Sequence, residues 1–125
     1  MPRGAAPFVY LYVTDRAAAH AFYRHTLELV FDREDDEGLQ FLSGDVALRV
    51  VPTADHVSSP HPVFGWVVED LVAHVRALAA AGVTFEVYDD LAQDADGIWR
   101  GPDGRTQKVW FRDPAGNVLM LTQES

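Results

Sequence analysis

The sequence contains no cysteine. This absence excludes a disulfide framework, a thiolate zinc site and a cysteine nucleophile. The chain also lacks any apolar run approaching the roughly 20 residues that cross a bilayer. Its first six residues carry one arginine and no long apolar stretch, which does not fit a secretory signal. We therefore expect a cytoplasmic protein that does not engage a membrane.

Basic residues are few. Ten Lys and Arg stand against 19 Asp and Glu, so the formal net charge is −9. Nucleic acids and anionic membranes both reward a basic surface, and neither is expected as a partner. A cationic small ligand would be attracted, although solubility alone also explains such a charge. The chain lacks a Gly-x-Ser-x-Gly motif and a glycine-rich phosphate loop, and no catalytic residue is assigned.

What the chain does contain is an internal repeat. A short apolar strand from Phe8 ends on Asp15 and leads into a helical stretch, and a strand from Val63 ends on Asp70 and does the same. A repeat of this size predicts two strand–helix–strand–strand–strand units within one domain of residues 1–125. We place module one at about residues 7–52, a linker at 53–62 and module two at about 63–123.

Local signals place the elements of each half. Asp15 is a suitable N-cap for a helix over residues 16–26, with a predicted buried stripe of Ala18, Ala21, Phe22 and His25. Gly82 is the expected C-cap of a second helix over residues 71–81. Polar breaks separate the expected strands, which follow residue 8 and residue 63 and cover residues 29–34, 39–42, 46–51, 84–88, 108–112 and 117–122.

The polar stretch 89–107 contains Trp99 and a Gly-Pro-Asp-Gly turn. A loop of this length in a compact domain is usually either functional or disordered.

Two segments resemble a known family. They are the helical run from Ala21 to Leu27 and the Arg-Asp-Pro-Ala-Gly-Asn stretch of residues 112–117. Together with the doubled pattern, they resemble the vicinal oxygen chelate superfamily, which includes glyoxalase I, extradiol dioxygenases and bleomycin-resistance proteins. The resemblance covers residues 8–122. One departure is Glu28, where the family usually places a glycine.

The resemblance implies an α+β fold in which two βαβββ modules form a half-open barrel around a cavity. Two chains would pair as a homodimer, directly or by domain swapping. Enzymes of the superfamily hold a divalent metal with His, Gln or Glu side chains from the first and last strands of each module. The matching positions in this chain are Phe8, Val63, Arg49 and Met120. None of them suits a hard divalent ion, so we predict no metal and no cofactor.

Strand alternation divides the remaining side chains into two faces. One parity is apolar and suits a core between sheet and helix: Val9, Leu11, Val13, Leu48, Val50, Phe64, Trp66, Val68, Leu119 and Leu121. The other parity, which includes Val118, is left to face the cavity. From that parity, the long loop and a late strand we predict these ligand-binding residues: Phe8, Tyr10, Tyr12, Arg49, Trp99, Trp110 and Met120.

These observations favour a metal-independent binding protein that sequesters a cationic or aromatic natural product, as in the bleomycin-resistance branch. Two alternatives stay open. One is a divalent-metal-dependent glyoxalase, lyase or dioxygenase with unusual ligands. The other is a binder of an unrelated metabolite.

Overall fold

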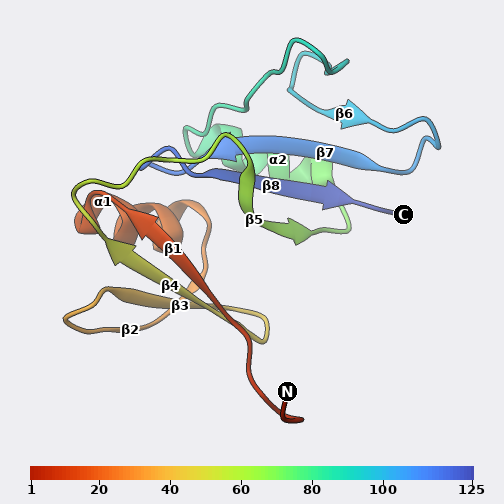
Figure 1. Cartoon of the computed structure of the whole chain (residues 1–125). Coiled ribbons are helices and arrows are strands. Elements are labelled where there is room, and N and C mark those ends of the chain that lie inside the picture. The colour runs from red at the N-terminus through yellow and green to blue at the C-terminus, as the bar shows by residue number, and fades with distance from the viewer. The chain divides into compact units, whose positions relative to one another are not determined.

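A computed structural model describes residues 1–125 as two compact units, residues 1–57 and residues 58–125. Each unit contains a four-stranded mixed sheet with a helical segment, so the fold is α+β (Figure 1). None of the helices has the length and apolar character that crossing a membrane requires.

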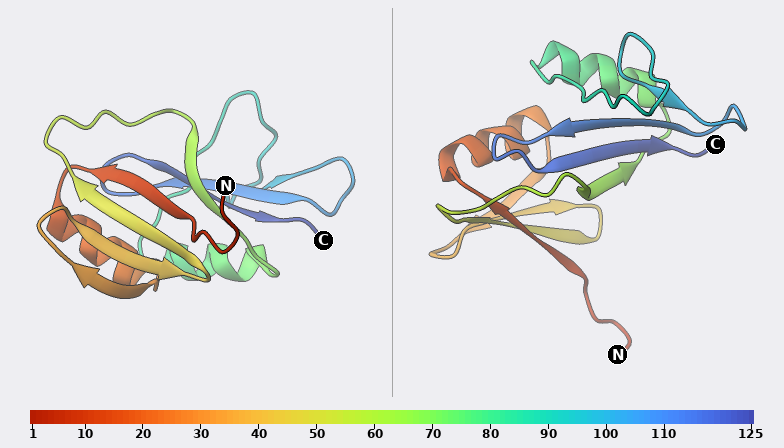
Figure 2. Two further views of the ribbon diagram at one scale, coloured as in Figure 1. Left: turned by 60° about the horizontal axis from the view of Figure 1, so that its bottom comes forward. Right: turned by 45° about the horizontal axis from the view of Figure 1, so that its top comes forward.

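In the first unit the strand order is β1-β4-β3-β2, with β1 parallel to β4 and the other pairs antiparallel. The helical segments lie along one face of this sheet (Figure 2). The elements in chain order are β1 Phe8–Val13, α1 Arg16–Ala21, η1 Phe22–Thr26, β2 Val30–Glu34, β3 Leu39–Ser43 and β4 Val46–Pro52.

The first helical segment begins as the sequence predicts. Asp15 has an extended backbone and its carboxylate accepts a hydrogen bond from the Ala18 N–H at 3.1 Å, which is an N-cap. After Ala21, however, the segment widens into the π-helical turn η1. The predicted stripe is wrong already within α1, because the buried face is centred on Ala19 and continues four residues later at Tyr23. The residues that are buried are Ala19 and Tyr23, whereas Ala21 and His25 are exposed.

The second unit repeats the order of elements. Its strand order is β5-β8-β7-β6, with β5 parallel to β8, and α2 lies along one face of the sheet (Figure 2). Asp70 caps α2 by accepting from the Ala73 N–H at 3.1 Å. The elements are β5 Pro62–Val67, α2 Leu71–Ala80, β6 Trp99–Arg100, β7 Gln107–Arg112 and β8 Val118–Gln123.

The predicted strand over residues 84–88 is wrong. Phe85 makes only an isolated bridge to Phe111, and the Tyr88 N–H donates to the side chain of Gln93 instead of to a neighbouring strand. The fourth strand of this sheet is the two-residue β6, inside the stretch that the sequence suggests is a loop.

The two cores follow the predicted alternation with one exception. Leu11, Leu48 and Leu121 are buried, as expected. Val118, assigned by parity to the cavity side, is fully buried. The register of β5 against β8 shifts between Pro62 and Phe64, so two residues of β5 oppose one residue near the start of β8.

Candidate functional site

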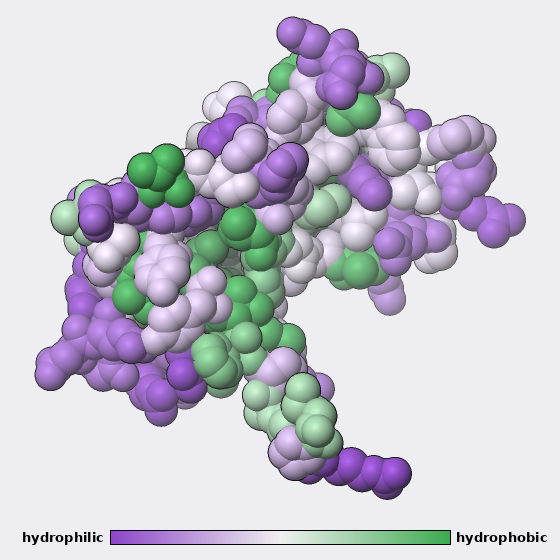
Figure 3. All heavy atoms as spheres, viewed as in Figure 1, coloured by the Kyte–Doolittle hydropathy of each residue, from purple (hydrophilic) through white to green (hydrophobic).

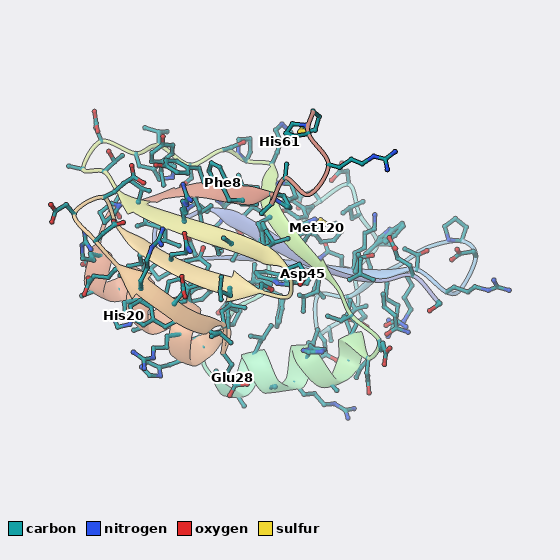
Figure 4. All side chains as sticks on the ribbon, turned by 90° about the horizontal axis from the view of Figure 1, so that it is seen from below. Phe8, His20, Glu28, Asp45, His61 and Met120 are labelled. Atoms are coloured by element: carbon teal, nitrogen blue, oxygen red, sulfur yellow. The ribbon has the colours of Figure 1, made fainter.

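A row of aromatic side chains lies on the face of the first sheet. Phe8, Tyr10 and Tyr12 alternate along β1, and 51%, 39% and 45% of their surfaces are exposed. Neighbouring rings meet edge to face, with centroids 5.8 and 5.9 Å apart. Leu11 and Val13, of the opposite parity, are buried. Apolar side chains gather over β1 in Figure 3, and Figure 4 labels Phe8 on this strand.

Arg49 extends this row onto the neighbouring strand. It pairs in register with Tyr10, and its guanidinium carbon lies 4.2 Å from the centroid of the Phe8 ring, in a cation–π contact. Its Nε–H donates to Gln40 Oε1 at 3.1 Å. The three ion pairs of the structure do not include Arg49, so no carboxylate lies within 4 Å of it.

Gln40, on β3, organises the polar centre of the face. Its Nε2 donates to Asp32 Oδ2 at 2.8 Å, and its Oε1 also accepts from Arg33 Nη2 at 3.4 Å. The register of β2 against β3 shifts between Phe31 and Arg33, so the strand carries one extra residue there. This bulge brings Asp32 and Arg33 to the same glutamine, since two residues of a bulged strand oppose one residue of its partner.

Beside Arg49 lies a small pocket with a cavity volume of about 60 Å³. Its acidic members are engaged. Asp35 Oδ1 accepts from the N–H groups of Glu37 and Gly38, and the Gly38 bond is the main cause that lowers the pKa of Asp35. A hydrogen bond with the Glu37 carboxylate raises the pKa of the Tyr10 hydroxyl, with a smaller contribution from desolvation. The lining is Arg33, Asp35, Glu37, Gly38, Leu39, Gln40, Arg49 and Val51.

The other three predicted site residues lie in the second unit. Trp110 and Met120 are direct cross-strand partners on β7 and β8. Trp99, on β6, pairs with Lys108, whose Nζ lies 5.7 Å from the centroid of its ring. All three are half-buried. Trp110 also meets Tyr88 edge to face at 5.5 Å.

Within the first unit, the structure therefore brings together Phe8, Tyr10, Tyr12 and Arg49. Within the second, it pairs Trp110 with Met120. Sequence reasoning left Arg49 without a named partner and missed Gln40. The signal for Gln40 was weak, because its role depends on a bulge that the strand pattern does not mark.

A family model for the glyoxalase/bleomycin resistance protein/dioxygenase superfamily matches residues 5–121. The chain belongs to this superfamily. No curated protein sequence matches the chain.

Solved structures of the superfamily share its fold. Lactoylglutathione lyase from Agrobacterium tumefaciens is 22% identical, with a TM-score of 0.73 over 98% of this chain and 96% of that one. TnmS3, an antibiotic binding protein from Streptomyces sp. CB03234, is also 22% identical, with a TM-score of 0.75 over 100% and 99% of the two chains. A superfamily member from Sphaerobacter thermophilus is 19% identical, with a TM-score of 0.73 over 97% and 98%.

The positions that hold a metal in enzymes of the superfamily do not fit one in this member. On β1 and β4 they carry Phe8 and Arg49, and the guanidinium that lies over the ring is a permanent cation. On β5 and β8 they carry Val63 and Met120, neither of which is a ligand for a hard ion. The structure contains no group of three or more His, Cys, Asp or Glu side chains placed to hold a metal ion.

Proposed function

We propose that this superfamily member is a metal-independent binding protein that sequesters a flat, aromatic small molecule. The observation that carries the proposal is the exposed row of Phe8, Tyr10 and Tyr12 on one sheet face, continued by Arg49. Three large aromatic side chains in edge contact offer a stacking surface, and surfaces of this kind on soluble proteins commonly mark binding sites.

Two further considerations support binding over chemistry. The face holds no paired nucleophile and base, and its acids are engaged by donors of their own unit. An antibiotic binding protein, TnmS3, also stands among the structures that share the fold. The same set includes a lactoylglutathione lyase, so the fold alone does not choose between binder and enzyme.

The sequence suggested a cationic or an aromatic ligand. The geometry favours an aromatic ligand over a cationic one, because this face already carries the cationic side chain of Arg49. In this proposal the family branch is the one that binds small molecules without a metal. A homodimer remains part of it, as the family resemblance implies.

The test is a titration of purified protein with a panel of flat aromatic compounds, in which binding is measured by the fluorescence of the aromatic rings or by calorimetry. Tyr10→Ala should weaken binding by about tenfold, because a stacked aromatic contributes on the order of 1 kcal/mol beyond its buried area. Tyr10→Phe is the matched control, since it keeps the ring and removes only the hydroxyl that meets Glu37. Trp99→Ala applies the same test to the face of the second unit.

Two results would count against the proposal. Unchanged affinity in both alanine variants would remove the proposed surface. Binding that disappears on treatment with a chelator and returns with a divalent ion would point to the metal-dependent enzyme instead.

A further inference from the structure

We propose that Arg49, positioned by Gln40 and Asp32, binds a carboxylate carried by the aromatic ligand. The inference rests on the proposed function and narrows it to one ligand class: flat aromatic carboxylic acids in their anionic form. Arg49 is then the residue that sets specificity, while Gln40 and Asp32 are positioning residues.

The first step is the orientation of the Gln40 amide. An ionised carboxylate only accepts hydrogen bonds, so Asp32 Oδ2 at 2.8 Å must face the amide NH2 group of Gln40. The amide oxygen is thereby turned toward β4, where it accepts from Arg49 Nε at 3.1 Å. Asp32 thus fixes Arg49 indirectly, through a neutral amide.

The second step is the hydrogen-bonding capacity that remains on Arg49. A guanidinium has five N–H donors, and only the Nε–H of Arg49 has a partner. Both groups that engage the guanidinium, the Gln40 amide and the Phe8 ring, are neutral. The outer edge formed by its two Nη groups is the geometry that carboxylates prefer for two parallel hydrogen bonds.

The third step is the local charge. The chain has a net charge of −9, yet Arg33 and Arg49 both converge on the one oxygen of Gln40, and neither has a carboxylate within 4 Å. The nearby acids form no ion pair with either arginine and bond to other groups instead. Asp32 is held by Gln40, Asp35 by backbone N–H groups and Glu37 by the Tyr10 hydroxyl. The Nη groups of Arg49 are therefore free to donate to an anionic ligand group without breaking an ion pair of the protein.

The position of Arg49 also determines the shape of the ligand. Arg49 lies directly beside the aromatic row, because β1 and β4 are neighbours and Tyr10 is its register partner. A flat ring stacked on that row would bring a carboxylate on its edge to the guanidinium. The pocket of about 60 Å³ lies next to Arg49, and Asp35 and Glu37 also line it.

The experiment compares three probes of one shape and different charge: 2-naphthoate, 2-naphthamide and 2-naphthylmethylammonium. The intact protein should bind 2-naphthoate about 10- to 100-fold more tightly than 2-naphthamide, the range expected for a charge-assisted pair. Arg49→Met should abolish this preference, so that 2-naphthoate and 2-naphthamide bind with similar affinity. Arg76→Met is the matched control, since it removes an exposed arginine from α2.

A double variant, Asp32→Asn with Gln40→Glu, keeps the net charge and exchanges the carboxylate and the amide. It gives Arg49 an internal carboxylate, so the preference for 2-naphthoate should fall even though Arg49 is present. Circular dichroism and the unfolding midpoint establish that each variant is folded.

The outcomes separate the two proposals. If none of the three probes binds, the proposed function fails. If the probes bind with equal affinity, or if the ammonium binds best, the aromatic surface stands and the role of Arg49 is overturned. A preference for 2-naphthoate that survives in Arg49→Met would also overturn it.

Discussion

Glu28 adopts the single left-handed backbone conformation of this chain outside glycine, with φ at 58°. Glu28, labelled in Figure 4, follows shortly after the π-helical turn. There the Leu27 N–H donates to the Phe22 carbonyl and the Leu29 N–H to the Tyr23 carbonyl. A left-handed residue at the end of a helix is usually glycine, because a Cβ crowds the backbone in that conformation. A glycine at this position would adopt the left-handed conformation without strain. In this chain Glu28 adopts it, and its backbone is strained.

Replacing Glu28 by glycine should stabilise the protein. The left-handed conformation costs a residue with a side chain about 1 kcal/mol, partly offset by the greater freedom of glycine in the unfolded chain. We expect Glu28→Gly to raise the free energy of unfolding by about 0.5–1 kcal/mol, measured by urea titration. Glu28→Ala keeps the strained conformation and should give no such gain. An equal gain in both variants would assign the effect to loss of the side chain.

At the same scale, the sequence located part of the candidate site. Strand alternation placed Phe8, Tyr10 and Tyr12 on the face opposite the core, and their exposure agrees with that placement. It could not find Gln40 or Asp32, because their meeting depends on the bulge in β2 and on side-chain hydrogen bonds across strands. Whether these residues bind a ligand stays a prediction.

At the scale of elements, the strands with clear alternation lie where the sequence predicts them, and the segment between α2 and β7 does not. Residues 84–88 have apolar and β-branched character, yet their pairing with β7 is limited to the Phe85–Phe111 bridge, beside which the Glu86 N–H donates to the Trp110 carbonyl at 2.7 Å. Gln93 donates to the carbonyls of Glu86 and Gly97 and accepts from the Tyr88 N–H, all at 2.8 Å. Local sequence propensity cannot predict that one side chain will form hydrogen bonds with three backbone groups. The long segment is consequently ordered through its own contacts.

Asp94 is a second residue whose side chain stabilises this segment. Its carboxylate accepts from the N–H groups of Asp96 and Ile98 at 2.9 and 3.0 Å and pairs with Arg100 at 2.6 Å. Burial acts to raise the pKa of Asp94, but the bonds from Arg100, Ile98 and Asp96 outweigh it and lower the pKa below its ordinary value. A lowered folded-state pKa gives stability that is present above the unfolded-state pKa, about 3.9. That stability is lost as the pH falls through the folded-state value.

Asp94→Asn should therefore lower the free energy of unfolding at pH 7 by about 1 kcal/mol, a modest figure because a third of the side chain is exposed. It should also reduce the loss of stability as the pH falls below about 4. Urea titrations at a series of pH values measure both effects. Asp90→Asn, in the same segment, should leave the unfolding free energy within about 0.5 kcal/mol. A variant as stable as the parent at pH 7 would show that Asp94 does not fasten the segment.

At the scale of the whole molecule, the two units repeat one topology with different side chains on their faces. Each keeps a cation over an aromatic ring, Arg49 over Phe8 in the first and Lys108 over Trp99 in the second. At the matching late-strand positions, however, the first unit has Arg49 and the second has Met120. Only the first face therefore combines an exposed aromatic row with a guanidinium that lacks an anionic partner. The repeat was visible in the sequence, but this difference in chemistry needed the contacts of each face.

Because the net charge of the chain is −9, the salt dependence of the association rate can reveal the sign of the ligand's charge. An anionic ligand approaches a repulsive overall field and is attracted by Arg49 only at close range, whereas a cationic ligand is attracted from a distance. Raising the ionic strength from about 10 to 150 mM shortens the screening length from roughly 30 to 8 Å, which weakens the long-range part first. We therefore expect the association rate of 2-naphthoate, measured by stopped-flow fluorescence, to rise with salt. The rate for neutral 2-naphthamide should stay constant. An association rate for 2-naphthoate that falls with salt would mean that the local field of Arg33 and Arg49 already dominates the approach. A clear preference for the ammonium probe that falls with salt would instead restore the cationic ligand that the acidic composition suggests.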